Sequence, residues 1–164
     1  MKNTAYAAHK ILTTQQLGPF IAAARLTGKT IAFTNGCYDI LHEGHIFSLS
    51  QAAAGADLLI VGVNADASVK KLKGEGRPVN NQHSRSLVLA SLIITDAVVI
   101  FEEDTPLNLI TAIQPDVLVK GGDYTIETIV GAKEVIGHGG RVIINPIIPS
   151  FSTTAIIDKI KHLK

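Results

Sequence analysis

The stretch Thr34-Asn35-Gly36-Cys37-Tyr38-Asp39-Ile40-Leu41-His42-Glu43-Gly44-His45 decides how this chain folds, because it joins a short apolar strand to a helix through a glycine-containing turn. The predicted strand covers residues 30–34, and the predicted helix covers residues 45–54. The first backbone N–H groups of a helix have no partner inside the helix, and the helix dipole favours negative charge at that end. Two histidines at this position, His42 and His45, therefore indicate a site that handles phosphate.

Apolar runs and helical patterns alternate along the rest of the chain. The clearest strand is Leu58-Leu59-Ile60-Val61-Gly62-Val63, a continuous apolar run of the kind that a parallel sheet covered on both faces requires. This alternation predicts an α/β fold, a Rossmann-like open parallel sheet of five strands with helices on both faces. The predicted strands cover residues 30–34, 58–63, 97–101, 117–120 and 141–144, and the main helices cover residues 14–27, 45–54, 82–93, 106–113, 128–136 and 153–162.

Residues 1–13 show no such pattern and predict a loosely held arm. The chain therefore divides into an N-terminal arm and helix over residues 1–28 and a main domain over residues 29–164. Polar and glycine-rich clusters follow several of the predicted strands. In open parallel sheets ligands bind outside the carboxyl ends of the strands, so these clusters mark the expected site.

Composition limits the function further. The chain has 164 residues, of which 46% are hydrophobic and 18% are charged, so it can bury a substantial core. A net charge of +1 excludes a large basic surface for nucleic acid, and the single cysteine, Cys37, excludes a disulfide framework and a cysteine-rich zinc site. No signal-peptide core and no apolar run long enough to cross a membrane occur, which predicts a cytoplasmic protein.

The histidine pair has three interpretations. The rings can donate hydrogen bonds to a polyphosphate, with Gly44 allowing close approach to the backbone; they can bind a metal, with Glu43 as a further ligand; or they can be two surface histidines. The dinucleotide motif G-x-G-x-x-G and the P-loop motif G-x-x-x-x-G-K-[ST] are both absent. Their absence favours the histidines as the phosphate-binding groups.

Further clusters each have a structural alternative. Lys120-Gly121-Gly122-Asp123 stands at the end of a predicted strand, where the lysine can bind a phosphate oxygen. The alternative is a simple strand-to-loop transition with a solvated lysine. Ser152-Thr153-Thr154 offers hydroxyls and helix N-terminal amides, or it is an ordinary N-cap. The basic segment from Lys70 to Arg77 is either a phosphate-closing loop or a solvated charge run.

Together these residues resemble a known family. The H-x-G-H motif at 42–45 with the Ser/Thr run at 152–154 resembles the nucleotidylyltransferase superfamily. Over about residues 30–160 the sequence is similar to heptose 1-phosphate adenylyltransferases. The resemblance is to the stand-alone form of these enzymes, which has no kinase domain. The segments that carry this likeness are residues 33–42, 61–69, 73–78, 101–106 and 119–124.

The resemblance implies that AMP is transferred from ATP to heptose 1-phosphate, giving ADP-heptose for lipopolysaccharide and pyrophosphate. It implies that Mg²⁺ arrives on ATP rather than on a protein site. The net charge and the short apolar runs predict that no nucleic acid or membrane is a partner, and the low charged fraction, with the superfamily's habit of pairing, predicts a homodimer. The resemblance assigns catalysis to His42, His45 and Lys73; nucleotide and phosphate binding to Thr34, Asn35, Gly36, Gly44, Lys120, Ser152, Thr153 and Thr154; and substrate binding to Asp39, Asn64, Arg77, Arg85, Gly122 and Asp123.

One position departs from the pattern. Many superfamily members carry a basic residue directly after the Ser/Thr run, whereas Ala155 stands here. We therefore expect a lysine from another segment to supply that charge. The alternatives are a cytidylyltransferase for glycerol 3-phosphate or a related alcohol phosphate, and a non-catalytic nucleotide-binding module.

Overall fold

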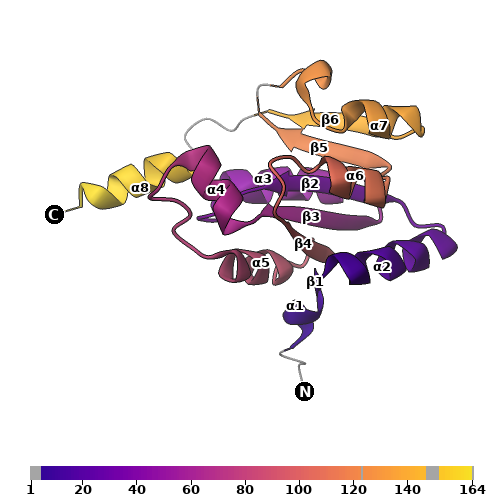
Figure 1. The fold of residues 1–164 in the computed structure, drawn as a ribbon, viewed down its shortest axis with the longest axis horizontal. Helices are drawn as coiled ribbons and strands as arrows, with labels where there is room; N and C mark the ends of the chain where they lie inside the picture. Colours follow the sequence, from indigo (N-terminus) through magenta and orange to yellow (C-terminus); the bar gives the residue numbers. More distant parts are fainter. Residues whose placement is uncertain (1–4, 123, 147–151, 164) are drawn as a thin grey trace.

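The computed structural model describes residues 5–122, 124–146 and 152–163 (Figure 1). Within these ranges one parallel sheet of six strands runs through the molecule in the order β1-β4-β3-β2-β5-β6. The strands after β1 follow the doubly wound order, in which the first central strand, β2, lies between β3 and β5. The strands are β1 (Ile11–Leu12), β2 (Ile31–Gly36), β3 (Leu58–Asn64), β4 (Ala97–Phe101), β5 (Val117–Gly121) and β6 (Arg141–Asn145).

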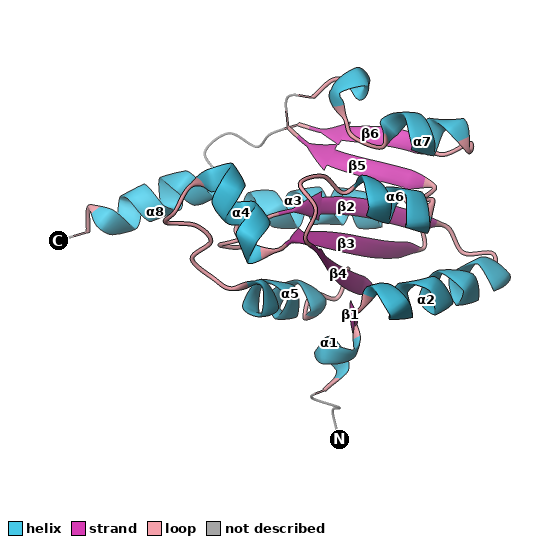
Figure 2. Cartoon of the chain, viewed as in Figure 1, coloured by secondary structure: helices cyan, strands magenta, loops and turns pink. Residues whose placement is uncertain are grey.

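Helices cover both faces of the sheet (Figure 2). Alternate strand residues point to opposite faces, so Ile31 and Phe33 join one core cluster while Ala32 joins the other. The first cluster packs against α2 (Thr14–Leu26), α6 (Leu107–Ile113) and α7 (Ala132–Gly137), and the second packs against α1 (Tyr6–His9), α3 (Glu43–Ala53) and α5 (Gln82–Ala90). The α/β prediction with a parallel sheet is therefore confirmed.

The five-strand prediction is wrong, because the N-terminal arm supplies a sixth strand. Ile11 and Leu12 of β1 align with Val98 and Val99 of β4, and the Lys10 carbonyl accepts a hydrogen bond from the Val98 amide. The Lys10 ammonium donates to the carbonyls of Leu92 and Thr95, at 3.2 and 2.6 Å. Residues 6–12 are therefore not loosely held. A strand of two residues is too short to produce a recognisable pattern.

Two helices differ in their bounds from the prediction. The helix predicted over residues 128–136 is a 3₁₀ turn, η1 (Ile126–Thr128), followed by α7, because Gly131 adopts a left-handed φ of +85° between them. α5 ends at Ala90, before the predicted residue 93. The division of the chain at residue 28 stays a prediction. No helix in the described ranges combines the length and apolar character that crossing a lipid bilayer requires.

The remaining helices stand at the carboxyl ends of the strands. α4 (Asp66–Lys73) follows β3 directly, and α8 (Thr153–Lys161) extends from the same end of the sheet (Figure 1). The order of the strands reverses between β2 and β5, which is the position where open α/β sheets bind ligands. The turn after β2 contains the histidine motif, so the fold brings it to this position.

Candidate active site

Two adjoining cavities lie at the carboxyl ends of β2, β3 and β5. The first, here the histidine cavity, has a volume of about 420 Å³, and the second, here the Lys120 cavity, has a volume of about 370 Å³. Their shared wall consists of Asn35, Gly36, Cys37, Lys73 and Gly121. The histidine cavity is lined further by Thr34, Tyr38, Asp39, His42, Gly44, His45, Ser48, Arg77, Pro146 and Ser152 to Thr154. The Lys120 cavity is lined further by Asn64, Leu72, Asp104, Thr105, Pro106, Lys120, Tyr124, Thr128, Ile129 and Val130.

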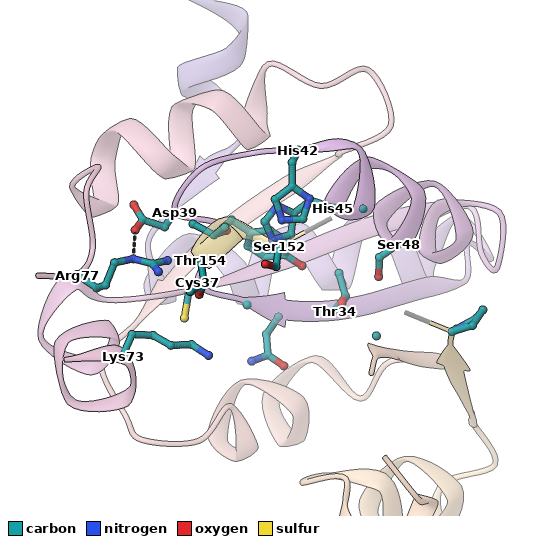
Figure 3. A pocket seen from close by; sticks show the side chains of 17 residues that line it. Thr34, Cys37, Asp39, His42, His45, Ser48, Lys73, Arg77, Ser152 and Thr154 are labelled. Atoms are coloured by element: carbon teal, nitrogen blue, oxygen red, sulfur yellow. Dashed lines mark hydrogen bonds and ion pairs between the residues drawn. The ribbon is translucent and has the colours of Figure 1, made fainter. Parts of the chain in front are cut away.

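The two histidines stand at the N-terminus of α3. His42 is the N-cap residue with an extended backbone, and His45 lies in the first turn. Their rings stack with centroids 3.8 Å apart and planes at 24° (Figure 3). Both rings therefore lie on one side of the helix start, and the first N–H groups of a helix are the ones that can bind an anion.

Burial controls the charge of this pair. Burial, with a smaller contribution from His42, lowers the pKa of His45 to about 4, and burial also lowers the pKa of His42. At neutral pH each ring is therefore uncharged, with one N–H donor and one acceptor nitrogen. Nδ1 of His45 is buried and makes no hydrogen bond to any described residue.

Tyr38 supports His45 from one side. Its ring meets the His45 ring edge-on with centroids 5.3 Å apart, and its backbone takes a left-handed φ of +48°. Burial, opposed by a hydrogen bond with Thr34, raises the pKa of Tyr38 to about 12. A bulky residue in this conformation is strained, and such strain is characteristic of functional sites.

The His45 pKa predicts a pH-dependent stability. The imidazole titrates near 6.5 in the unfolded chain and near 4 in the folded chain. Between these values the unfolded state binds a proton that the folded state does not, so stability falls as pH decreases through this window. We expect wild type to lose about 2–3 kcal/mol more than His45→Gln between roughly pH 7.5 and pH 4.5. Urea unfolding of both proteins measures the difference, and equal losses would contradict the burial of His45.

Lys120 is fixed at the end of β5. Its ammonium donates to Oδ1 of Asn35 at the end of β2, with an N–O distance of 2.6 Å, and burial lowers its pKa. Asn64 also lines the Lys120 cavity, and its side-chain amide donates to the Ser68 hydroxyl at 3.1 Å. The Lys120 cavity therefore combines one oriented cation with amide and hydroxyl groups.

Ser152 to Thr154 line the histidine cavity from the start of α8 (Figure 3). The Ser152 hydroxyl accepts a hydrogen bond from the Ala155 amide at 3.0 Å, so Ser152 is also an N-cap. Lys73 and Arg77 belong to the same lining. The segment before α5 therefore brings two cations to this cavity, where the residue after the Ser/Thr run, Ala155, carries no charge.

Several predicted substrate-binding residues have partners inside the chain. The Asp39 carboxylate lines the histidine cavity but accepts a hydrogen bond from Arg77 Nε at 2.5 Å. Arg85 lines neither large cavity and is 2% exposed. Gly122 lines neither cavity either; its φ is +137°, and a Cβ there would lie 2.9 Å from the Tyr124 ring. Asp123 lies outside the described residues.

Two residues of the histidine cavity, Tyr38 and Ser48, were not predicted from the sequence. Ser48 lies three residues after His45 on the helix, a spacing that could have revealed it, and the Asn145 amide contacts its carbonyl at 3.3 Å. Tyr38 gave no signal, because nothing in its neighbours predicts a left-handed backbone. In the described ranges no group of three or more His, Cys, Asp or Glu side chains could hold a metal ion.

Known proteins match most of this chain at high sequence identity. The chain is 52% identical over 161 residues to the bifunctional protein HldE of Acidiphilium cryptum, and 56% identical over 143 residues to that of Nitrobacter winogradskyi. These matches cover 98% and 87% of this chain. The chain spans about a third of each relative, 33% and 29% of their lengths.

Solved structures share the fold. The lipopolysaccharide core biosynthesis protein from Thermoplasma volcanium aligns with a TM-score of 0.59 and 25% identity, over 74% of this chain and 98% of that one. Pantoate-beta-alanine ligase from Francisella tularensis aligns with a TM-score of 0.60 over 93% of this chain and 78% of its own, but at 15% identity it shows the fold alone. A family model described as cytidylyltransferase-like matches residues 33–159. The chain belongs to the cytidylyltransferase-like family.

Proposed function

We propose that this chain is an adenylyltransferase that transfers AMP from Mg²⁺-bound ATP to D-glycero-D-manno-heptose 1-phosphate. The observation that carries the proposal is the stacked His42/His45 pair at a helix N-terminus, next to a second cavity that contains a fixed lysine. The relatives named HldE and the structural neighbour named for lipopolysaccharide core biosynthesis support this choice of substrate.

The reaction is a displacement at phosphorus. An ionised oxygen of the sugar phosphate attacks the α-phosphorus of ATP in line, and a new P–O bond forms as the bond to the β-phosphate oxygen breaks. Pyrophosphate leaves with the bonding electron pair, and ADP-heptose remains. The attacking oxygen already carries negative charge, so the chain needs no covalent nucleophile and acts by positioning and charge stabilisation.

The histidine cavity accommodates the triphosphate in this proposal. The neutral imidazoles of His42 and His45 donate hydrogen bonds to phosphate oxygens, as do the free amides at the starts of α3 and α8. Lys73 lies in the wall shared by both cavities, so its ammonium can reach the α-phosphate as negative charge develops there. Mg²⁺ enters as part of the ATP substrate and neutralises phosphate charge.

The Lys120 cavity accommodates the sugar phosphate. Lys120 suits the phosphate, and the polar side chains of Asn64, Thr105 and Thr128 suit the hydroxyls of a sugar. Asn35 belongs to the shared wall and orients the Lys120 ammonium through its side-chain oxygen. The two phosphates then meet at that shared wall, where Gly36 and Gly121 themselves carry no side chain.

Pyrophosphate release with a matrix of substrates tests the proposal. ATP, CTP, GTP and UTP are each combined with heptose 1-phosphate and with glycerol 3-phosphate. We expect turnover with ATP and heptose 1-phosphate. Turnover only with CTP and glycerol 3-phosphate would establish the second candidate, which the cytidylyltransferase-like family favours. Binding of ATP without turnover of any pair would indicate a non-catalytic module.

Metal removal gives a further prediction. Because Mg²⁺ neutralises the triphosphate, we expect EDTA to abolish turnover and excess Mg²⁺ to restore it. A zinc-selective chelator should leave turnover unchanged, because no described cluster could hold a metal ion. Turnover that persists in EDTA but is lost on zinc chelation would support a metal bound by the histidines.

The remaining expectations accompany the function. The proposal includes a cytoplasmic enzyme that supplies ADP-heptose for lipopolysaccharide synthesis, acts without nucleic acid or membrane, and forms a homodimer. Light scattering at several concentrations measures the oligomeric state, and a monomer at all of them would exclude the dimer.

A further inference from the structure

The Asp39 carboxylate is occupied by donors of its own chain. Its side chain is 0% exposed, and Oδ2 accepts from Arg77 Nε at 2.5 Å. The Val79 amide donates to both oxygens at 2.8 and 2.9 Å, and the Asn80 amide donates to Oδ1 at 2.9 Å. Burial by itself raises the pKa of Asp39, but the bonds from Asn80, Val79 and Arg77 outweigh it and lower that pKa. The carboxylate is therefore a charged anchor for residues 77–80.

The Arg85 guanidinium connects the neighbouring segments. It donates to the carbonyl of Cys37, the residue after β2, at 2.5 Å. It also donates to the carbonyl of Asn64, the last residue of β3, at 2.8 Å. It also donates to the Asp66 carboxylate at the start of α4, at 2.7 Å, and to the Asn80 carbonyl, at 3.0 Å. These partners satisfy the donors of a planar guanidinium in several directions at once, so the surrounding backbone is fixed in position.

These contacts hold the segment between α4 and α5 at both ends. Arg85 fixes the start of α4, the helix whose last residue is Lys73. Asp39 fixes residues 77–80, which include Arg77. Lys73 and Arg77 both line the histidine cavity between these two attachments (Figure 3). The distance from the cations to the histidine-bearing turn therefore depends on Asp39 and Arg85.

We propose that Asp39 and Arg85 are positioning residues that together form a brace. Asp39 anchors residues 77–80 and Arg85 anchors the start of α4, so that Lys73 and Arg77 are held across the cavity from His42 and His45. This role differs from the substrate binding that the family resemblance implies for both side chains. The ligand that Lys73 and Arg77 bind follows from the proposed AMP transfer. The positioning of these two side chains follows from the hydrogen bonds of Asp39 and Arg85 alone. A displacement of about 1 Å at a catalytic group costs about 100-fold in rate, so such a brace affects turnover strongly.

Asp39→Asn tests the brace, because it keeps the shape and removes the charge and one acceptor. We expect hydrogen exchange at the Val79 and Asn80 amides to accelerate about 10-fold or more, since each loses a charge-assisted hydrogen bond. Tryptic cleavage after Lys73 should accelerate as well. Turnover should fall about 10-fold or more in kcat, while KM for each substrate changes less than about threefold.

Asp116→Asn is the matched control. The Asp116 carboxylate also accepts from an arginine, Arg25 at 2.6 Å, and from a backbone amide, that of Ile31 at 2.7 Å, but it lies at the opposite end of β2. We expect this variant to lose stability while kcat, KM and exchange at Val79 and Asn80 remain those of wild type. Equal effects of both variants on kcat would mean that Asp39 has only a general structural role.

Two results would overturn the brace. One is unchanged exchange at Val79 and Asn80 in Asp39→Asn. The other is unchanged kcat with a raised KM for the sugar phosphate, which indicates direct substrate contact. Exchange and proteolysis do not depend on turnover, so the brace is tested even if the proposed substrates prove wrong.

Asn80→Ala serves if Asp39→Asn does not fold. It keeps the carboxylate and removes only the 2.8 Å bond from the Asn80 side chain to the Asp39 carbonyl. We expect the same changes with a smaller magnitude. Hydrogen exchange at the Val79 amide should be faster than in wild type, and kcat should fall by a larger factor than KM changes. Unchanged exchange and unchanged kcat in this variant would argue against the brace.

Discussion

His45→Ala is expected to lower kcat by about 100-fold or more, the scale of losing one donor that stabilises a transition state. Nδ1 of His45 is buried without a partner among the described residues, and the ring stacks on His42 at the wall of the histidine cavity. The imidazole is thus already desolvated and oriented before substrate binds. Steady-state kinetics with the active nucleotide pair measures the loss, and circular dichroism verifies that the variant is folded.

Two further variants define what His45 supplies. His45→Gln keeps an N–H donor and should recover part of the lost rate. His138→Ala removes an imidazole that contacts the Pro115 carbonyl at 3.0 Å, away from both cavities, so its kcat should match wild type. Unchanged turnover in His45→Ala would remove this histidine from the mechanism, and an equal loss in His138→Ala would point to general destabilisation.

Arg85→Ala is expected to destabilise the protein by about 3–5 kcal/mol, the usual cost of breaking a buried charged network by removing one partner. The residue is 2% exposed, and its loss leaves three backbone carbonyls and the Asp66 carboxylate without their donor. In a chain of 164 residues this lowers Tm by about 6–20 °C. Urea unfolding and thermal unfolding both measure the effect.

Arg25→Ala is the comparison for this variant. Arg25 also binds a carboxylate and a backbone carbonyl, those of Asp116 and Gln114, but its side chain is 36% exposed. An ion pair at such exposure contributes about 1 kcal/mol or less. Equal losses in the two variants would show that burial of Arg85 contributes nothing special to stability.

The sheet could be predicted because its strands are continuous apolar runs. Leu58 to Val63 fits only a strand that is covered on both faces, and most of that run is buried in β3. β1 escaped prediction because Ile11 and Leu12 form a strand only through β4, whose matching residues lie more than eighty positions away. Local pattern cannot report a pairing that depends on a distant partner. The resemblance to nucleotidylyltransferases is confirmed by the family match.

The location of the candidate site could be predicted where residue type and position along the chain carry the signal. His42, His45 and the Ser/Thr run that begins α8 stand at helix starts, and the sequence marks these starts directly. The partners of Asp39 could not be predicted, since Arg77, Val79 and Asn80 lie about forty residues away in a loop. A carboxylate beside a histidine motif suggests a substrate contact until its own hydrogen bonds are known.

The short strand β1 has a consequence for the solubility of the protein. Without it β4 would end the sheet with unpaired backbone groups beside the buried side chains of Val98 and Val99. An exposed apolar strand of this kind recruits strands from other molecules and promotes aggregation. β1 therefore covers the backbone groups at the edge of β4. A chain shortened to begin after residue 12 should precipitate at concentrations where the full chain stays dissolved.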